Sequence, residues 1–116
     1  MKRLSKSQRR SLLRERTALL KEVSSLSHLI RGTLFHRYST CSRPACACHR
    51  GDRHGPRYYV AVTSRNTQRQ HYVPKSQVET VREGIQRYHR LLDIMDRLTV
   101  INLTLMKGRC LDDDVS

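Results

Sequence analysis

Apolar residues recur at helical spacing over the first part of the chain. Leu12, Leu19, Val23, Leu26 and Ile30 follow steps of seven, four, three and four, with Leu13, Leu20 and Leu29 beside them, which is typical of one face of an amphipathic helix. Ser5 or Ser7 can cap the start, and neither Pro nor Gly interrupts the stretch before Gly32. We therefore predict one long helix over residues 8–32.

The same spacing returns towards the end of the chain. Aliphatic and aromatic residues line one stripe from position 78 to position 105, and Gly108 supplies a stop signal. Ser76 stands three residues before Glu79, which is the spacing of a capping box. The pattern predicts a second helix over residues 76–107, long enough to pair antiparallel with the first.

Between the two predicted helices the periodicity changes. Residues 33–56 show no helical spacing and are rich in Cys, Arg, Gly and His, so we expect a loop that needs an internal tie. Residues 57–63 and 68–73 combine aromatic and β-branched side chains on either side of a polar turn, which predicts a β-hairpin. Two strands alone are marginally stable, so the hairpin must pack against the helices or the loop.

Four potential metal ligands share the expected loop, residues 38–56. They are Cys41, Cys46, Cys48 and His54, in a C-x4-C-x-C-x5-H pattern. Three thiolates and one imidazole complete the tetrahedral set that Zn²⁺ prefers, and a closed set leaves no position for catalytic water, so we expect a structural zinc ion. His49 is the alternative fourth ligand. It is disfavoured because it directly follows Cys48 and must point away from a metal that Cys48 holds.

The compartment decides how clustered cysteines are used. No stretch reaches the length of a membrane span and no apolar run follows Lys2 and Arg3, so we expect a cytoplasmic protein without a signal peptide or membrane contact. A reducing compartment favours metal binding by clustered thiols. A disulfide between Cys41 and Cys46 remains an alternative, as does an iron–sulfur cluster that adds Cys110, which is otherwise a free thiol.

Together these elements predict a mainly α fold, with two long antiparallel helices flanking a zinc-binding loop and a small β-hairpin. Within one domain we distinguish a basic N-terminal helix (1–37), the zinc loop and hairpin (38–74), a C-terminal amphipathic helix (75–107) and an acidic frayed tail (108–116). When the two helices pair, one apolar stripe remains uncovered, which favours a homodimer or a helical partner protein. The residues of this expected interface are Ile94, Leu98, Ile101 and Leu105.

Composition limits the core and adds a strong positive charge. The 116 residues are 37% hydrophobic with one Phe and no Trp, so the core must be thin and needs a staple such as a metal. The formal net charge of +13, mostly from arginine, favours DNA or RNA as a polyanionic partner. Tyr58, Tyr59 and Tyr72 are available either for base stacking or for the core. The expected phosphate contacts are Arg9, Arg10, Arg14, Arg16, Lys21, Arg43, Arg50, Arg53 and Arg57.

The loop and its flanks resemble a known family. The shared motifs, in order, are Leu-Ile-Arg-Gly-Thr-Leu at residues 29–34, the three-cysteine loop, His54-Gly55-Pro56 followed by Tyr58-Tyr59, and Tyr72-Val73-Pro74-Lys75. In these the chain resembles a family of short, uncharacterised bacterial and archaeal proteins often encoded beside transposase genes. The resemblance covers residues 29–105 and leaves most of the basic N-terminal helix outside. Members tend to have Gly where this chain has Ser42 and Ala45, and the resemblance implies a mobile-element setting but little mechanism.

Three classes of function fit these observations unequally. The first is a zinc-stabilised nucleic-acid-binding accessory protein linked to a mobile element or transposase. The alternative is a structural adaptor or dimerisation subunit of a larger recombinase or nucleoprotein complex. An enzyme is least expected, because only three acidic residues precede position 75 and paired carboxylates are hard to assemble. In addition, no motif groups His36, His49 and His71.

Overall fold

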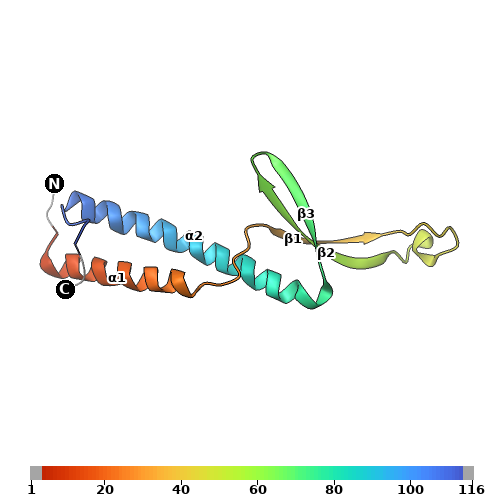
Figure 1. Cartoon of the computed structure of the whole chain (residues 1–116), viewed down its shortest axis with the longest axis horizontal. Coiled ribbons are helices and arrows are strands. Elements are labelled where there is room, and N and C mark those ends of the chain that lie inside the picture. Colours follow the sequence, from red (N-terminus) through yellow and green to blue (C-terminus); the bar gives the residue numbers. More distant parts are fainter. Residues whose placement is uncertain (1–3, 114–116) are drawn as a thin grey trace. The chain divides into compact units, whose positions relative to one another are not determined.

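The computed structural model describes residues 4–113 and contains two long helices and a three-stranded sheet (Figure 1). In chain order the elements are α1 (Lys6–Ser25), β1 (Thr33–Ser39), η1 (Ala47–Arg50), β2 (His54–Ser64), β3 (Thr67–Val73), η2 (Lys75–Gln77) and α2 (Val78–Lys107), where η marks a short 3₁₀ turn. The chain forms two compact units. The helical unit is Met1–Ser27 with Arg87–Ser116, and the sheet unit is His28–Gln86.

Serines define both ends of α1. The Ser5 hydroxyl accepts a hydrogen bond from the Gln8 backbone, and the Gln8 side chain accepts one from the Ser5 backbone, which completes a capping box. At the other end, the hydroxyls of Ser24 and Ser25 donate to carbonyls three residues back, at 2.7 and 2.6 Å. Such bonds compete with the helical pattern. The helix therefore ends at Ser25 and not at residue 32 as predicted, and the chain turns at His28, whose φ is 53°.

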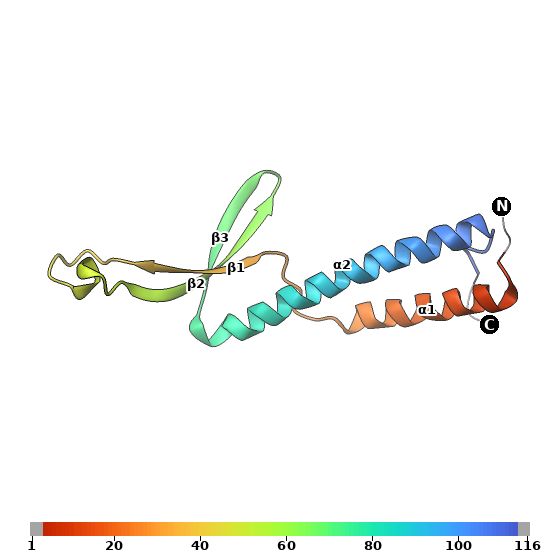
Figure 2. The same cartoon turned by 180° about the vertical axis from the view of Figure 1, so that it is seen from behind.

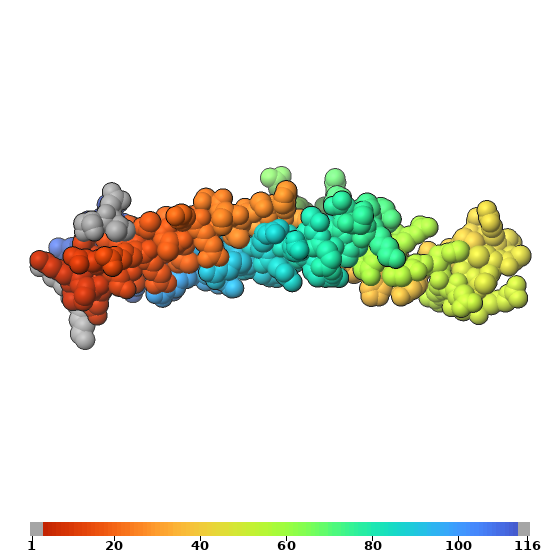
Figure 3. All heavy atoms as spheres, turned by 90° about the horizontal axis from the view of Figure 1, so that it is seen from below, coloured from red at the N-terminus to blue at the C-terminus, as the bar shows by residue number. Residues whose placement is uncertain are grey.

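In the helical unit α1 packs antiparallel against the later turns of α2. Glu15 pairs with Arg97 and Glu22 pairs with Arg90. Later positions of α1 therefore lie beside earlier positions of α2, as antiparallel packing requires. Figure 3 shows α1, in red and orange, lying along the blue end of α2. The core between them is formed by Leu13, Ile101, Leu105 and Cys110.

The stripe predicted as an oligomer interface is buried within the chain. Its four side chains, Ile94, Leu98, Ile101 and Leu105, are at most 6% exposed. They belong to the interior of the helical unit, because α2 turns this stripe inward when it pairs with α1. The surplus of apolar surface lies on a different ridge of α2, formed by Leu92, Met95, Leu103 and Met106.

We predicted a frayed tail over residues 108–116, of which 114–116 lie outside the described residues. The described part, residues 108–113, is held against α1. Arg9 Nε donates to Asp113 Oδ2 at 2.8 Å. Arg16 donates to the backbone carbonyls of Leu111 and Asp113, at 2.9 and 2.6 Å, and to the side chain of Asn102 at 3.0 Å. Two of the N-terminal arginines thus serve to anchor the tail.

The sheet unit contains the predicted hairpin and a further strand. β2 and β3 pair antiparallel across a turn in which Arg65 and Asn66 have φ of 48° and 66°, as a type I′ turn requires. β1 pairs antiparallel with β2, giving the order β1-β2-β3 (Figure 2). One face of the sheet packs on the first turns of α2. This core contains Val60, Val73 and Val78, flanked by Ile30, Leu34, Tyr58, Val81 and Ile85.

The fold is therefore α+β, and the prediction of a mainly α fold is wrong. The strand β1 occupies Thr33–Ser39, which we expected to be loop. Each face of this strand mixes an apolar residue with a cationic or polar one, since Leu34 shares its side with His36 and Phe35 shares its side with Arg37. No clear alternation is left to signal a strand, and pairing with β2 specifies it instead.

The start of α2 also differs from the prediction. Ser76 lies inside η2, where the Gln77 backbone N–H donates to the Pro74 carbonyl. The helix α2 begins only at Val78. Glu79 forms an ion pair with Arg82, and the predicted capping box with Ser76 is not found among the described residues. The end of α2 at Lys107, just before Gly108, agrees with the prediction. In the part of the chain that the structure describes, no helix has the length and apolar character of a membrane span.

Candidate functional site

The four predicted metal ligands converge at one end of the sheet unit. Cys41 follows β1, Cys46 caps η1, Cys48 lies within η1, and His54 is the first residue of β2. β1 and β2 pair as far as Ser39 and His54, which brings the two ends of the intervening loop together. The four donor atoms all lie within 4.8 Å of one another. The loop, in yellow, extends from these strand ends (Figure 1).

The distances between the donor atoms suit a tetrahedral metal ion. With bonds of about 2.3 Å to sulfur and about 2.0 Å to nitrogen, a tetrahedral zinc ion separates two sulfurs by roughly 3.8 Å and a sulfur from a nitrogen by roughly 3.5 Å. The Sγ atoms of Cys41 and Cys48 are 3.6 Å apart, and Cys46 Sγ lies 3.4 Å from His54 Nε2. The donor set and its spacing therefore fit a metal ion.

Backbone groups in the loop stabilise thiolates. The Cys48 backbone N–H is the main cause that lowers the pKa of Cys46 to about 7, with further hydrogen bonds from Cys48, Cys41 and His54. The Cys41 N–H donates to Cys48 Sγ at 3.2 Å, although burial of Cys48 raises the pKa of its thiol. Hydrogen bonds of this kind orient metal ligands and support the charged form of sulfur.

The positions of the two candidate histidines and of Cys110 distinguish between the alternative ligand sets. His54 belongs to the cluster of donors, whereas the exposed His49 does not, as predicted. Cys110 is 6% exposed and packs with Leu13 and Leu105 in the helical unit, so it does not complete a four-cysteine set. All four cysteines are free thiols, without the Cys41–Cys46 disulfide.

The predicted phosphate contacts divide into two groups. Arg9 and Arg16, both predicted to contact phosphate, donate hydrogen bonds to Asp113 of the C-terminal tail and are only half-exposed. The others are exposed, and within residues 4–113 none of them is paired with a carboxylate; Arg50 donates only to the Ala45 carbonyl. These exposed cations are Arg10, Arg14 and Lys21 on α1, and Arg43, Arg50, Arg53 and Arg57 in and beside the metal loop.

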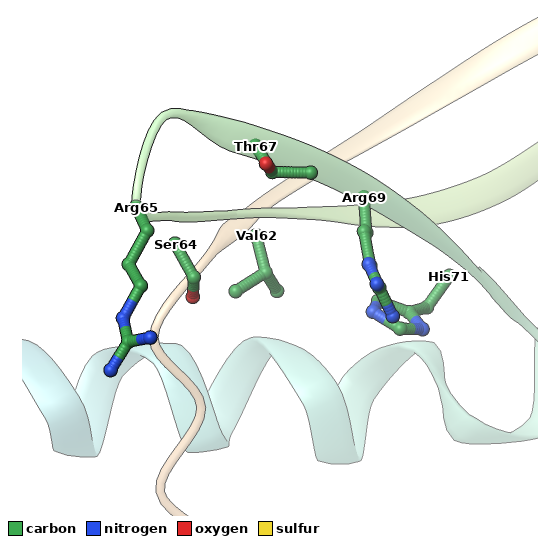
Figure 4. Close-up of a pocket in the computed structure, with 6 residues that line it drawn as sticks. All are labelled: Val62, Ser64, Arg65, Thr67, Arg69 and His71. Carbon is green, nitrogen blue, oxygen red and sulfur yellow. The ribbon is translucent and has the colours of Figure 1, made fainter.

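A second cationic feature lies on the β2–β3 hairpin, where we predicted no site. A depression of about 420 Å³ is lined by Arg65, Arg69 and His71 together with polar and aliphatic side chains of the same hairpin. Figure 4 shows the side chains of Arg69 and His71 pointing to the same side of the hairpin, with Arg65 at the turn. The hairpin register could have revealed this feature, because Arg69 pairs with Val62 and His71 pairs with Val60 on one face.

The other two candidate histidines lie in different surroundings. His36 contacts the rings of Tyr38 and Tyr58, with ring centroids 5.7 and 5.8 Å apart. His49 follows Cys48 on the exposed side of η1.

Comparison with known proteins identifies a family. The sequence profile of a domain of unknown function, DUF6788, matches residues 6–83. The chain belongs to the DUF6788 family. The matched region of this DUF6788 protein includes α1, which the resemblance placed mostly outside the family, and contains the whole cluster of metal ligands. No curated protein and no solved structure matches the chain.

Proposed function

We propose that this DUF6788 protein is a zinc-stabilised nucleic-acid-binding accessory protein. The observation that carries the proposal is the charge of the sheet unit. Residues 31–69 contain eight arginines and a single acidic residue, Asp52. The arginines are Arg31, Arg37, Arg43, Arg50, Arg53, Arg57, Arg65 and Arg69.

These charges differ from those of the helices. On the helices carboxylates neutralise arginines, as in the pairs of Glu15 with Arg97 and Glu22 with Arg90. In the sheet and loop no such ion pair occurs among the described residues, and three thiolates with one Zn²⁺ would subtract only a single charge. Unpaired arginines held on a sheet and a metal-tied loop suit the bidentate binding of phosphate groups.

The metal would act as a staple in this proposal. Four protein ligands close its coordination shell, so it supplies no open position for substrate. Cys48 alone is buried among residues 40–53, so apolar packing within the loop is scarce. Arg43, Arg50 and Arg53 would keep a fixed spacing only while the loop is tied. Native mass spectrometry with and without a chelator tests this part, with one zinc ion per chain expected.

Salt dependence tests nucleic-acid binding itself. If about six phosphates are engaged, the logarithm of the affinity for duplex DNA should fall against the logarithm of salt concentration with a slope near −5. Changing both Arg43 and Arg53 to Gln should make the slope shallower by about 2. The matched control changes Arg90 and Arg97 to Gln, which removes the same charge from ion-paired positions. If the two double variants lost the same amount of affinity and of salt dependence, a specific phosphate-binding surface would be contradicted.

The cellular setting of the proposal comes from the resemblance to short proteins that are often encoded beside transposase genes. We propose a cytoplasmic protein that works beside a mobile element or its transposase and binds without catalysing a reaction. A metal-dependent nicking assay on supercoiled DNA tests the last point, since turnover that is lost in a Cys46→Ser variant would contradict it.

A second candidate function is an adaptor or dimerisation subunit. The exposed ridge of Leu92, Met95, Leu103 and Met106 favours it, because positions separated by 3, 8 and 3 residues fall on one side of a helix. Sedimentation equilibrium should then report an oligomer that Leu103→Glu dissociates. A monomer at all concentrations, with no partner co-purifying, would contradict this function.

A further inference from the structure

The face of the sheet that points away from the core carries an aromatic row. Phe35, Tyr59 and Tyr72 are direct cross-strand neighbours on β1, β2 and β3. The rings of Phe35 and Tyr59 are stacked with centroids 5.6 Å apart, and Tyr59 meets Tyr72 edge to face at 5.9 Å. The row thus crosses all three strands.

These rings do not belong to the core of the sheet unit. Successive side chains of a strand point to opposite faces, and the core residues Val60 and Val73 each adjoin a member of the row. Tyr72 is 60% exposed, and Phe35 and Tyr59 are partly exposed. The chain has only six aromatic residues, and placing three of them on an open face is costly for such a thin core. A ligand that covers the row would explain this placement.

Arg37 adds a cation to the row. Its guanidinium carbon lies 5.5 Å from the centre of the Phe35 ring and 5.0 Å from that of the Tyr59 ring. Arg37 Nη2 donates to Gln70 Oε1 at 2.7 Å, so its partner is neutral and its positive charge is not balanced by a carboxylate. Arg57 pairs with Arg37 across the strands and is also exposed.

We propose that this face binds single-stranded nucleic acid by stacking unpaired bases. The inference rests on the proposed function and names its substrate class. A base stacks on Tyr72, the most exposed ring, while Arg37 and Arg57 contact the adjoining phosphates. In a duplex the faces of the bases are already covered by their neighbours, so an aromatic row on an open sheet selects unpaired bases. Stacking does not read sequence, because every base has a flat aromatic face.

The test compares tyrosines on opposite faces of the same sheet. Tyr72→Ala removes the exposed ring of the row, and Tyr38→Ala removes an exposed tyrosine from the side of β1 that carries His36. The probes are fluorescein-labelled ten-nucleotide oligo(dT) and oligo(rU) and a DNA duplex, measured by fluorescence anisotropy at constant salt. Zinc content and circular dichroism of each variant establish that the fold is retained.

We expect Tyr72→Ala to weaken binding of the single strands roughly tenfold, with Tyr72→Phe and Tyr38→Ala close to the parent protein. Unequal loss for oligo(dT) and oligo(rU) would tell DNA from RNA as the source of the unpaired bases. Equal effects of Tyr72→Ala and Tyr38→Ala, or tighter binding of the duplex than of both single strands, would overturn the inference while leaving the proposed function in place. Absence of salt-dependent binding to every probe would remove both.

Discussion

Removing the metal should release the loop of residues 41–54 and spare the two cores. The metal cluster closes a loop of 14 residues, from Cys41 to His54. By analogy with a cross-link over a loop of this length, its loss removes about 3 kcal/mol of stabilisation. The only buried side chain of residues 40–53 is Cys48, so little packing can compensate. A loss of about 3 kcal/mol corresponds to hydrogen exchange on the order of a hundredfold faster in the loop.

Hydrogen exchange followed by mass spectrometry measures this release. The backbone N–H groups of Cys46, His49 and Asp52 donate to carbonyls inside the loop, at 3.1 to 3.3 Å, and they should exchange faster after chelation or in Cys46→Ser. Amides of α1 should keep their protection. Cys110→Ser is the control, because this thiol lies in the helical unit and its loss should leave metal content and loop exchange unchanged. Unchanged loop exchange in Cys46→Ser would refute the reasoning.

Three further predictions concern the cores and the ion pairs. Leu13→Ala should lower the free energy of unfolding of the helical unit by roughly 2–5 kcal/mol, because this side chain is 1% exposed; urea titration followed by circular dichroism measures it, and a loss under 1 kcal/mol would contradict the assigned core. Gly84→Ala should destabilise the sheet unit, since an added Cβ would lie 2.3 Å from the carbonyl oxygen of His28; a variant that melts with the parent would refute this contact. The hydrogen bond from Arg97 lowers the pKa of Glu15 below its ordinary value of 4.5, so this pair stabilises the fold above that pH and the effect is lost as pH falls through the lowered pKa. Thermal melts of Glu15→Gln against the parent should therefore converge in acid, and a constant difference down to pH 2 would contradict the assignment.

The metal cluster was predictable because its signal is local. Cys41, Cys46 and Cys48 are close in sequence, and the spacing of His54 allows it to return to them. The hairpin was predictable for a similar reason, since the turn at Arg65 and Asn66 is flanked by two short runs of strand-forming residues. Chemistry that depends on neighbours in sequence can be read without knowing the fold.

Features that depend on contacts between residues far apart in the sequence could not be predicted. β1 gains its conformation from pairing with β2, and neither of its faces is uniformly apolar. Arg9 and Arg16 are cationic like their neighbours, yet only the fold brings the tail residue Asp113 beside them. The row that contains Phe35 and Tyr72 likewise requires the register of three strands. Charge and aromatic content were visible in the sequence, but their grouping was not.

The position of His54 at the start of β2 makes the metal a check on strand alignment. His54 pairs with Ser39, two residues before Cys41, and the register shift between Arg37 and Ser39 carries the alignment of β1 with β2 over to the metal ligands. A slip by one residue would reverse the side chains of β1, turning Phe35 towards the interior and Leu34 towards solvent. The same slip would draw Cys41 away from the imidazole. A bound ion would therefore add stability to the alignment in which Phe35 faces outward, which the packing of Leu34 against the sheet core already favours.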